Sequence, residues 1–116
     1  MTYSTLLFSI EDNICTIAIK QEDVVDAHYG TLHYKSGMLS SYGSFSFQYG
    51  RVDIRAKCPT GRGFWGTLWL LPISQASRPE LDILELLGFQ PTHAHLNAHL
   101  VGPSDIGTDM VVADLT

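Results

Sequence analysis

Strict alternation of polar and apolar residues between positions 49 and 58 is the pattern that most restricts the fold of this chain. The polar positions Arg51, Asp53, Arg55 and Lys57 alternate with the apolar positions Val52, Ile54, Ala56 and Cys58. Because successive side chains of a strand point to opposite faces, the pattern predicts an antiparallel strand with one wet face. A second alternation covers residues 93–100, and its polar positions are His93, His95, Asn97 and His99. No stretch carries a convincing helical period, so the predicted fold class is all-β.

Shorter β-type runs predict the remaining strands. Residues 6–10 and 14–20 are predicted to form a hairpin around Glu11, Asp12 and Asn13, whereas the acidic and unpatterned residues 21–30 predict a loop. Further strands are predicted at residues 32–39, at 64–71 and from 110 to 113. The run at 64–71 is almost continuously apolar, which is typical of a buried strand.

The acidic stretch at residues 80–85 is the hardest part of the sequence to explain without chemistry. In a strand, Glu80 and Asp82 share one face while Leu81 and Ile83 point into a core. In a regular strand Glu85 would then point to the core side, opposite to Glu80 and Asp82. A β-bulge near Leu84 would absorb one residue and bring all three acids onto one surface.

Three carboxyl groups on one surface repel one another, and such crowding raises the pKa of at least one of them. A retaining glycosidase uses this situation, with one ionised carboxylate as nucleophile and a protonated one as acid, roughly 5 to 5.5 Å apart. Two other interpretations fit the same residues. An edge strand with solvated charge is the usual explanation and is favoured for the acidic run taken alone. A calcium site would also use clustered carboxylates, but normally from a loop with glycine.

Length and charge limit the function. The 116 residues form at most one domain. The net charge of -5 argues against a nucleic acid as partner and leaves a neutral polymer open. No apolar run approaches the ~20 residues of a membrane span, and the first residues lack the regions of a signal peptide. Cys15 and Cys58 are placed like small core residues, and a single disulfide between them stays open.

The order of the motifs resembles a known family. Residues 43–57, then Trp65-Gly66-Thr67-Leu68-Trp69-Leu70-Leu71-Pro72, then the Glu-x-Asp-x-x-Glu spacing of Glu80, Asp82 and Glu85, resemble the laminarinase-like branch of glycoside hydrolase family 16. Gly66 and Thr67 replace the usual Pro and Ala, and Asp53 replaces a more usual Glu. The resemblance implies an antiparallel β-sandwich of jelly-roll, concanavalin A-like type. It also implies that residues 1–116 are a single partial domain, since the family domain is about twice as long.

The resemblance further implies roles for individual residues. Glu80 would be the nucleophile, Asp82 the helper acid and Glu85 the acid/base of a retaining endo-glycosidase. Trp69 would be a sugar platform rather than the core residue that an apolar run predicts, whereas for Trp65 core and cleft are equally open. His99 would line the cleft near the acids. The alternating His93, His95 and His99 could instead bind a metal, but no carboxylate in the sequence is evidently tied to them, and we expect none.

The bulged spacing favours β-1,3-glucan as substrate, with mixed-linkage glucan, agar and carrageenan as alternatives. The resemblance implies an extracellular, monomeric enzyme in its complete form, without a cofactor, although a structural calcium ion is compatible with the complete domain. A non-catalytic carbohydrate-binding sandwich or inactive remnant is the second hypothesis, and a metal-dependent jelly-roll oxygenase is a distant third. The complete set of three acids favours the enzyme.

Overall fold

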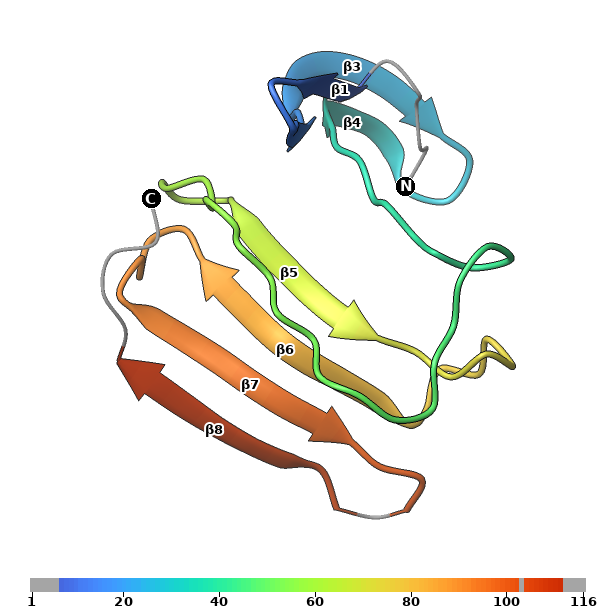
Figure 1. Cartoon of the computed structure of the whole chain (residues 1–116). Helices are drawn as coiled ribbons and strands as arrows, with labels where there is room; N and C mark the ends of the chain where they lie inside the picture. The colour runs from blue at the N-terminus through green and yellow to red at the C-terminus, as the bar shows by residue number, and fades with distance from the viewer. Residues whose placement is uncertain (1–6, 103, 112–116) are drawn as a thin grey trace. The chain divides into compact units, whose positions relative to one another are not determined.

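The computed structural model describes residues 7–102 and 104–111 (Figure 1). The chain forms two compact units, Met1–Phe45 and Ser46–Thr116, and each is considered by itself. All eight strands of the described residues lie in antiparallel sheets, and these residues form no α-helix. The predicted all-β antiparallel class is therefore confirmed. That residues 1–116 form one partial domain stays a prediction.

The first unit begins with a tight hairpin of β1 (Phe8–Glu11) and β2 (Ile14–Ile17). The two residues between the strands, Asp12 and Asn13, both have positive φ, at 48° and 61°. Such a two-residue turn matches the twist of the flanking strands, and Asp and Asn tolerate it better than most side chains. The predicted hairpin is confirmed, but its second strand ends at Ile17, before the expected residue 20.

The predicted loop at residues 21–30 is wrong, because β3 (Lys20–Asp26) pairs there with β4 (Gly30–Lys35). The acidic side chains that obscured the strand pattern find basic partners across the ladder. Asp23 lies 2.8 Å from His33, and Glu22 pairs with Lys35. A register shift between Gln21 and Val24 also breaks the alternation that would have predicted a strand.

The turn from β3 to β4 is built by Asp26. Its Oδ1 accepts hydrogen bonds from the backbone N–H groups of His28 and Tyr29, at 2.8 and 3.0 Å. These two bonds lower the pKa of the Asp26 carboxyl. Gly30 then adopts a φ of 73°, which suits a residue without Cβ. As a result β4 begins at Gly30 and ends at Lys35, earlier than the expected 32–39.

The second unit contains one four-stranded antiparallel sheet in the order β5-β6-β7-β8 (Figure 1). Its strands are β5 (Trp65–Leu70), β6 (Glu80–Leu87), β7 (His93–His99) and β8 (Ile106–Val111). The alternation over residues 93–100 is confirmed as β7. The last strand begins four residues before the predicted 110, and residue 113 lies outside the described residues.

One face of this sheet is apolar and carries the small core of the unit. Leu86 is fully buried and Ala94, its partner on β7, is 3% exposed. The register places apolar side chains from all four strands on this face: Leu68, Leu70, Leu81, Leu84, Leu86, Ala94, Leu96, Ala98, Ile106 and Met110. The opposite face is therefore left for polar groups.

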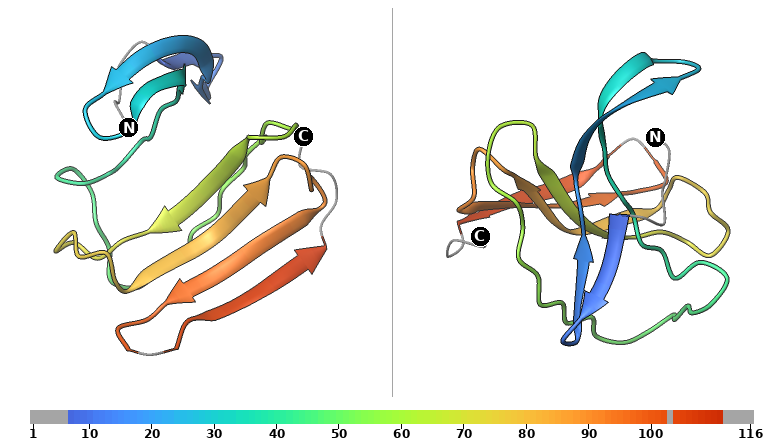
Figure 2. Two further views of the ribbon diagram at one scale, coloured as in Figure 1. Left: turned by 180° about the vertical axis from the view of Figure 1, so that it is seen from behind. Right: turned by 90° about the horizontal axis from the view of Figure 1, so that it is seen from above.

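Residues 49–58, for which the sequence predicts a strand, run extended but are not part of any ladder. Their alternation is nevertheless used, because this segment lies along the apolar face of the sheet (Figure 2). Val52 lines a recess with Leu70 and Leu81, and Cys58 packs so closely on Gly66 that a Cβ there would lie 3.3 Å from its Sγ. The prediction of a strand is wrong, since residues 46–64, all described, include no strand. A segment that lies over the face of the sheet, and not beside an edge strand, has no ladder partner.

Burial also differs from expectation at two other places. The apolar run at 64–71 forms β5, but as an edge strand, so Trp65 is 63% and Leu71 42% exposed. Cys58 is buried as predicted, whereas Cys15 is exposed because every residue of β2 is exposed in its two-stranded sheet. Both thiols are free. In the described parts of the chain, no helix has the length and apolar character to cross a membrane.

Candidate active site

A bulge in β6 places the three acids on the polar face of the sheet. Asp82 is paired with Asn97 and Glu85 with His95, so Ile83 and Leu84 together oppose the single residue Leu96. On the other side of β6, Leu84 pairs with Leu68 and Asp82 with Trp69, which leaves Ile83 as the additional residue. The bulge predicted near Leu84 is confirmed. It restores the parity that brings Glu85 to the side of Glu80 and Asp82.

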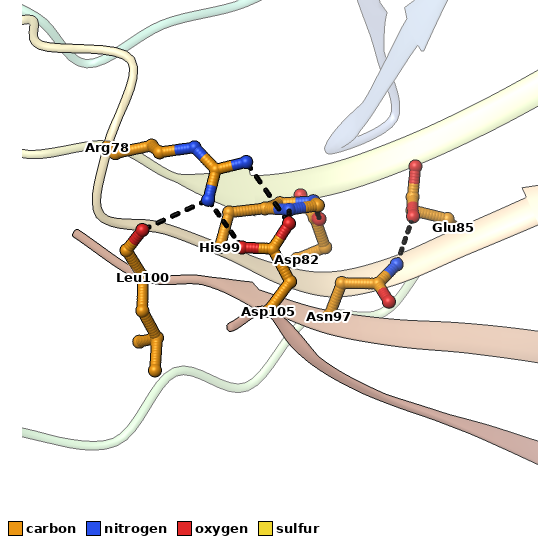
Figure 3. A network of polar contacts seen from close by, with 7 residues as sticks. All are labelled: Arg78, Asp82, Glu85, Asn97, His99, Leu100 and Asp105. Carbon is orange, nitrogen blue, oxygen red and sulfur yellow. Dashed lines mark hydrogen bonds and ion pairs between the residues drawn. The ribbon is translucent and has the colours of Figure 1, made fainter. Parts of the chain in front are cut away.

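Asp82 is the buried member of this acidic group. Its side chain is only 5% exposed, and its Oδ2 lies 3.1 Å from Nε2 of His99 (Figure 3). Burying a carboxylate is unfavourable unless a cation or a hydrogen-bond donor compensates it. The imidazole of His99 is that partner, which agrees with the expectation that His99 lies near the acids.

His99 is held from its other side by a second carboxylate. Its Nδ1 lies 3.0 Å from Oδ2 of Asp105, which also accepts a hydrogen bond from Arg78 at 3.1 Å. The hydrogen bond to Asp105 raises the pKa of His99, and the charges of Asp105 and Asp82 raise it further, against partial burial and Arg78. Hydrogen bonds from Arg78 and His99 keep the pKa of Asp105 well below its ordinary value.

Glu80 occupies the first position of β6 and pairs with His99 across the ladder. Partial burial raises the pKa of the Glu80 carboxyl, and the negative charge of Asp82 raises it further, whereas His99 acts in the opposite direction. The predicted rise in one carboxyl pKa thus occurs, with burial as the larger cause and crowding as the second. It falls on Glu80, the residue to which the resemblance assigns the nucleophile's role.

Glu85 receives a hydrogen bond from a residue that the sequence did not mark as functional. Nδ2 of Asn97 donates to Oε2 of Glu85 (Figure 3). The sequence did contain a signal, because Asn97 shares the polar side of the alternation with His95 and His99. Which carboxylate it would meet depends on the bulge.

Both tryptophans lie on the acid face. Trp69 pairs directly with Asp82, and Trp65 is four residues earlier on the same side of β5. Trp69 is half-buried and Trp65 mostly exposed, so Trp65 is not the core residue that one interpretation of the sequence proposed. Aromatic rings next to carboxylates suit the apolar face of a sugar ring, since such a ring carries both C–H and hydroxyl groups.

Two of the three histidines of β7, His95 and His99, have carboxylate neighbours that the sequence did not reveal. His95 Nδ1 contacts Oδ1 of Asp109 on β8, whereas His93 contacts Thr92 at 3.2 Å. His95 Nε2 is a buried atom without a hydrogen-bond partner. Among the described residues, no three or more potential ligands come together in a way that could hold a metal ion. His93, His95 and His99 therefore contact different partners rather than a common point.

Comparison with known proteins shows which family the chain is similar to. A model of glycosyl hydrolases family 16 matches residues 2–115. An endo-1,3-1,4-beta-glycanase of Rhizobium meliloti (strain 1021) is 36% identical over 99 residues, which are 84% of this chain and 21% of that protein. A beta-glucanase of Rhodothermus marinus is 38% identical over 78 residues, or 61% of this chain and 27% of that protein.

Among solved structures, the laminarinase catalytic domain from Thermotoga maritima MSB8 matches with a TM-score of 0.84 and 32% sequence identity. The match covers 97% of this chain and 47% of that one. The chain thus spans about half of the Thermotoga laminarinase domain and about a fifth of the Rhizobium glycanase. With a family match over almost every residue and the three acids aligned by a bulge, the chain belongs to glycosyl hydrolases family 16.

Proposed function

We propose that the protein is a retaining endo-glycosidase that hydrolyses internal β-glycosidic bonds of a polysaccharide, with β-1,3-glucan as the substrate. The observation that carries the proposal is the bulge in β6, because it puts Glu80 and Glu85 on one face with the buried Asp82 between them. Two carboxyl groups on one face of a bound sugar are the minimum that glycoside hydrolysis requires.

In the first step of the proposed reaction, the Glu80 carboxylate attacks the anomeric carbon while Glu85 gives its proton to the departing glycosidic oxygen. One C–O bond breaks, and an ester between the sugar and Glu80 forms. In the second step Glu85 takes a proton from water, and the water oxygen attacks the same carbon and releases Glu80. Two inversions give net retention, and the protons balance without a cofactor.

The surroundings of Glu80 act on its charge in opposite directions. Burial and the negative charge of Asp82 raise the pKa of Glu80, whereas the positive charge of His99 lowers it and so favours the ionised form that the attack requires. The half-buried Trp69 lies opposite Asp82, where a sugar ring could stack beside the reacting carbon. The negative net charge of -5 suits a neutral glucan better than a sulfated polymer.

The choice of glucan rests on the spacing of the acids and on the names of the similar proteins, which are a laminarinase, an endo-1,3-1,4-beta-glycanase and a beta-glucanase. A polymer of this kind is usually met outside the cell, so we propose an extracellular place of action. For the complete domain we propose a monomer, as the family resemblance implies.

The test is release of reducing sugar from laminarin, lichenan, agarose and carrageenan, measured with this chain and with a version extended at both ends. A double Glu80→Gln, Glu85→Gln variant is the control, since both replacements keep the side-chain volume. We expect release from laminarin above all, and none from the control. Binding of laminarin without hydrolysis by the extended version would support a carbohydrate-binding role instead and would contradict the proposal.

A further inference from the structure

Arg78 and Asp105 form an ion pair beside the acids that the proposed reaction does not use directly. Both nitrogens of the guanidinium fork contact the two carboxylate oxygens of Asp105. The same guanidinium donates to the carbonyl oxygen of Leu100 at 3.0 Å (Figure 3). Such a two-point contact fixes direction as well as distance, which a single point charge does not.

The place of these residues in the fold gives the pair its importance. Arg78 lies two residues before β6 begins, Leu100 directly follows β7, and Asp105 directly precedes β8. A single guanidinium therefore joins three strands at one end of the sheet, where β6 and β8 begin and β7 ends. The chain separations, 22 residues to Leu100 and 27 to Asp105, mean that only the folded sheet brings these groups together.

His99 stands between this pair and the buried Asp82. Its Nδ1 is 3.0 Å from Asp105 and its Nε2 is 3.1 Å from Asp82. A neutral imidazole has one N–H and one lone pair, so it would turn a lone pair toward one of the two carboxylates. Only the imidazolium donates from both nitrogens. The geometry therefore matches an alternating row of charges, Arg78 positive, Asp105 negative, His99 positive and Asp82 negative.

We propose that the Arg78–Asp105 pair is a positioning device for Asp82, acting through His99. Asp105 fixes the Nδ1 side of the ring and keeps the ring charged, so that Nε2 donates to Asp82. Arg78 fixes Asp105. Asp82 is thereby held in one orientation between Glu80 and Glu85, and none of the three supporting residues needs to touch substrate. The link to catalysis rests on the proposed function, whereas the link from Asp105 to His99 does not.

The charged groups around His99 define the pH range in which this device works. Glu80 and Asp82 face it from β6, and Asp105 and Arg78 face it from the segments before β8 and β6. The pKa of His99 is raised, so its contribution is complete below the ordinary value of 6.5 and is lost as pH rises through the raised pKa. The pKa of Asp105 is lowered, so its contribution is lost only in acid below 3.8.

The direct test is an NMR titration of the His99 ring in the wild-type chain and in Asp105→Asn, with resonances assigned through His99→Gln. The wild-type pKa should lie above 6.5, and Asp105→Asn should move it down toward that ordinary value. Asp109→Asn is the matched control, because Asp109 is on the same β8 side of the sheet but contacts His95. It should leave the titration of His99 unchanged.

A second measurement needs no variant. At pH 6.5, the ordinary pKa of the ring, nitrogen chemical shifts of wild-type His99 should report protons on both Nδ1 and Nε2 in most molecules. A neutral ring at that pH, or a His99 pKa that Asp105→Asn leaves unchanged, would overturn the proposal even if the protein hydrolyses glucan.

The catalytic consequence is read from the pH profile of kcat in the protein that hydrolyses glucan. Asp105→Asn should move the alkaline limb to lower pH and reduce kcat with little change in KM, and Asp105→Glu should restore the limb in part. If the wild type hydrolyses glucan but the limb does not move, the positioning role is refuted. If the wild type hydrolyses no glucan, the proposed function fails, and the ring titration still decides the role of Asp105.

Discussion

Asn97 donates a hydrogen bond to Glu85, although the residue that faces Asn97 across the ladder is Asp82. This diagonal contact exists because of the bulge at Ile83 and Leu84. Asp82 and Glu85 are three positions apart on β6, whereas the residues they face on β7 are only two positions apart. Asp82 is then free to meet His99, the next polar residue along β7. Each of these two acids thus has its own partner on the neighbouring strand, which lets carboxyl groups of one face differ in environment.

The two glutamates should be distinguishable by chemical rescue. In the protein that hydrolyses glucan, Glu80→Ala should abolish turnover, and added azide should attack from the nucleophile's side to give a glycosyl azide of inverted configuration. Glu85→Ala should still form the covalent intermediate from substrates with good leaving groups, and azide should then give the retained anomer. NMR of the products reads the anomers. Exchanged outcomes would reverse the assignment, and net inversion by the wild type would refute the retaining mechanism.

Asp82→Asn should reduce kcat by about tenfold or more while changing substrate binding little, which corresponds to at least about 1.4 kcal/mol in the barrier. The side chain keeps its volume but loses the charge that contacts His99 and acts on Glu80. Steady-state kinetics on laminarin measures both quantities. Asp53→Asn, at an exposed residue paired with Arg51, is the isosteric control and should have no effect. An unchanged kcat in Asp82→Asn would remove Asp82 from the mechanism.

Trp69→Ala should weaken oligosaccharide binding while the protein stays folded. A fully buried aromatic residue would lose about 3 to 5 kcal/mol on truncation, but Trp69 is only half-buried and lies on the acid face, so a smaller loss is expected. Leu86→Ala provides the comparison, because Leu86 is fully buried and should lose about 2 to 5 kcal/mol. Thermal melting beside a laminari-oligosaccharide titration separates the two effects. If Trp69→Ala unfolds most of the protein, and the fraction that stays folded binds the oligosaccharide unchanged, Trp69 is a core residue and not a sugar platform.

Glu80→Gln should raise the melting temperature near neutral pH and have little effect in acid. The pKa of Glu80 is raised by burial and by Asp82, so its ionised form destabilises the folded chain once the pH exceeds that pKa. Below the ordinary value of 4.5 the carboxyl is protonated in both the folded and the unfolded state, and the difference disappears. Calorimetry at about pH 7 and about pH 3.5 makes the comparison. An equal change at both pH values would mean that the charge of Glu80 is not the cause.

The isolated chain should associate in solution. Ile106 and Met110 on the edge strand β8 lie on the apolar face of the sheet and are 64% and 49% exposed. Trp65 is exposed on the other edge strand, β5. Unpaired edges with exposed apolar side chains favour contact between copies. Light scattering during gel filtration should show oligomers that dissociate on dilution, and Ile106→Lys should reduce them. A monomeric chain of 116 residues that melts cooperatively would contradict this expectation.

The sequence by itself determined the features that depend on neighbouring residues. A period of two predicts β structure wherever it occurs, so the all-β class and the strand at residues 93–99 followed directly from the residue order. Counting parity along residues 80–85 was enough to predict the bulge and the common face of Glu80, Asp82 and Glu85. The turn at Asp12 and Asn13 was equally local, because a two-residue turn depends on what those two residues tolerate.

The tertiary structure decided everything that needed a partner from elsewhere in the chain. Residues 49–58 have the alternation of a strand but belong to no ladder, whereas residues 20–26 lack it and are paired. Asn97 meets Glu85 only because of a bulge on another strand, and Arg78 meets Asp105 across 27 positions of sequence. A side-chain pattern indicates which face of a segment is polar and which is apolar. Hydrogen bonds and ion pairs form only between groups that folding brings within about 3 Å, and this distance is a property of the assembled sheet.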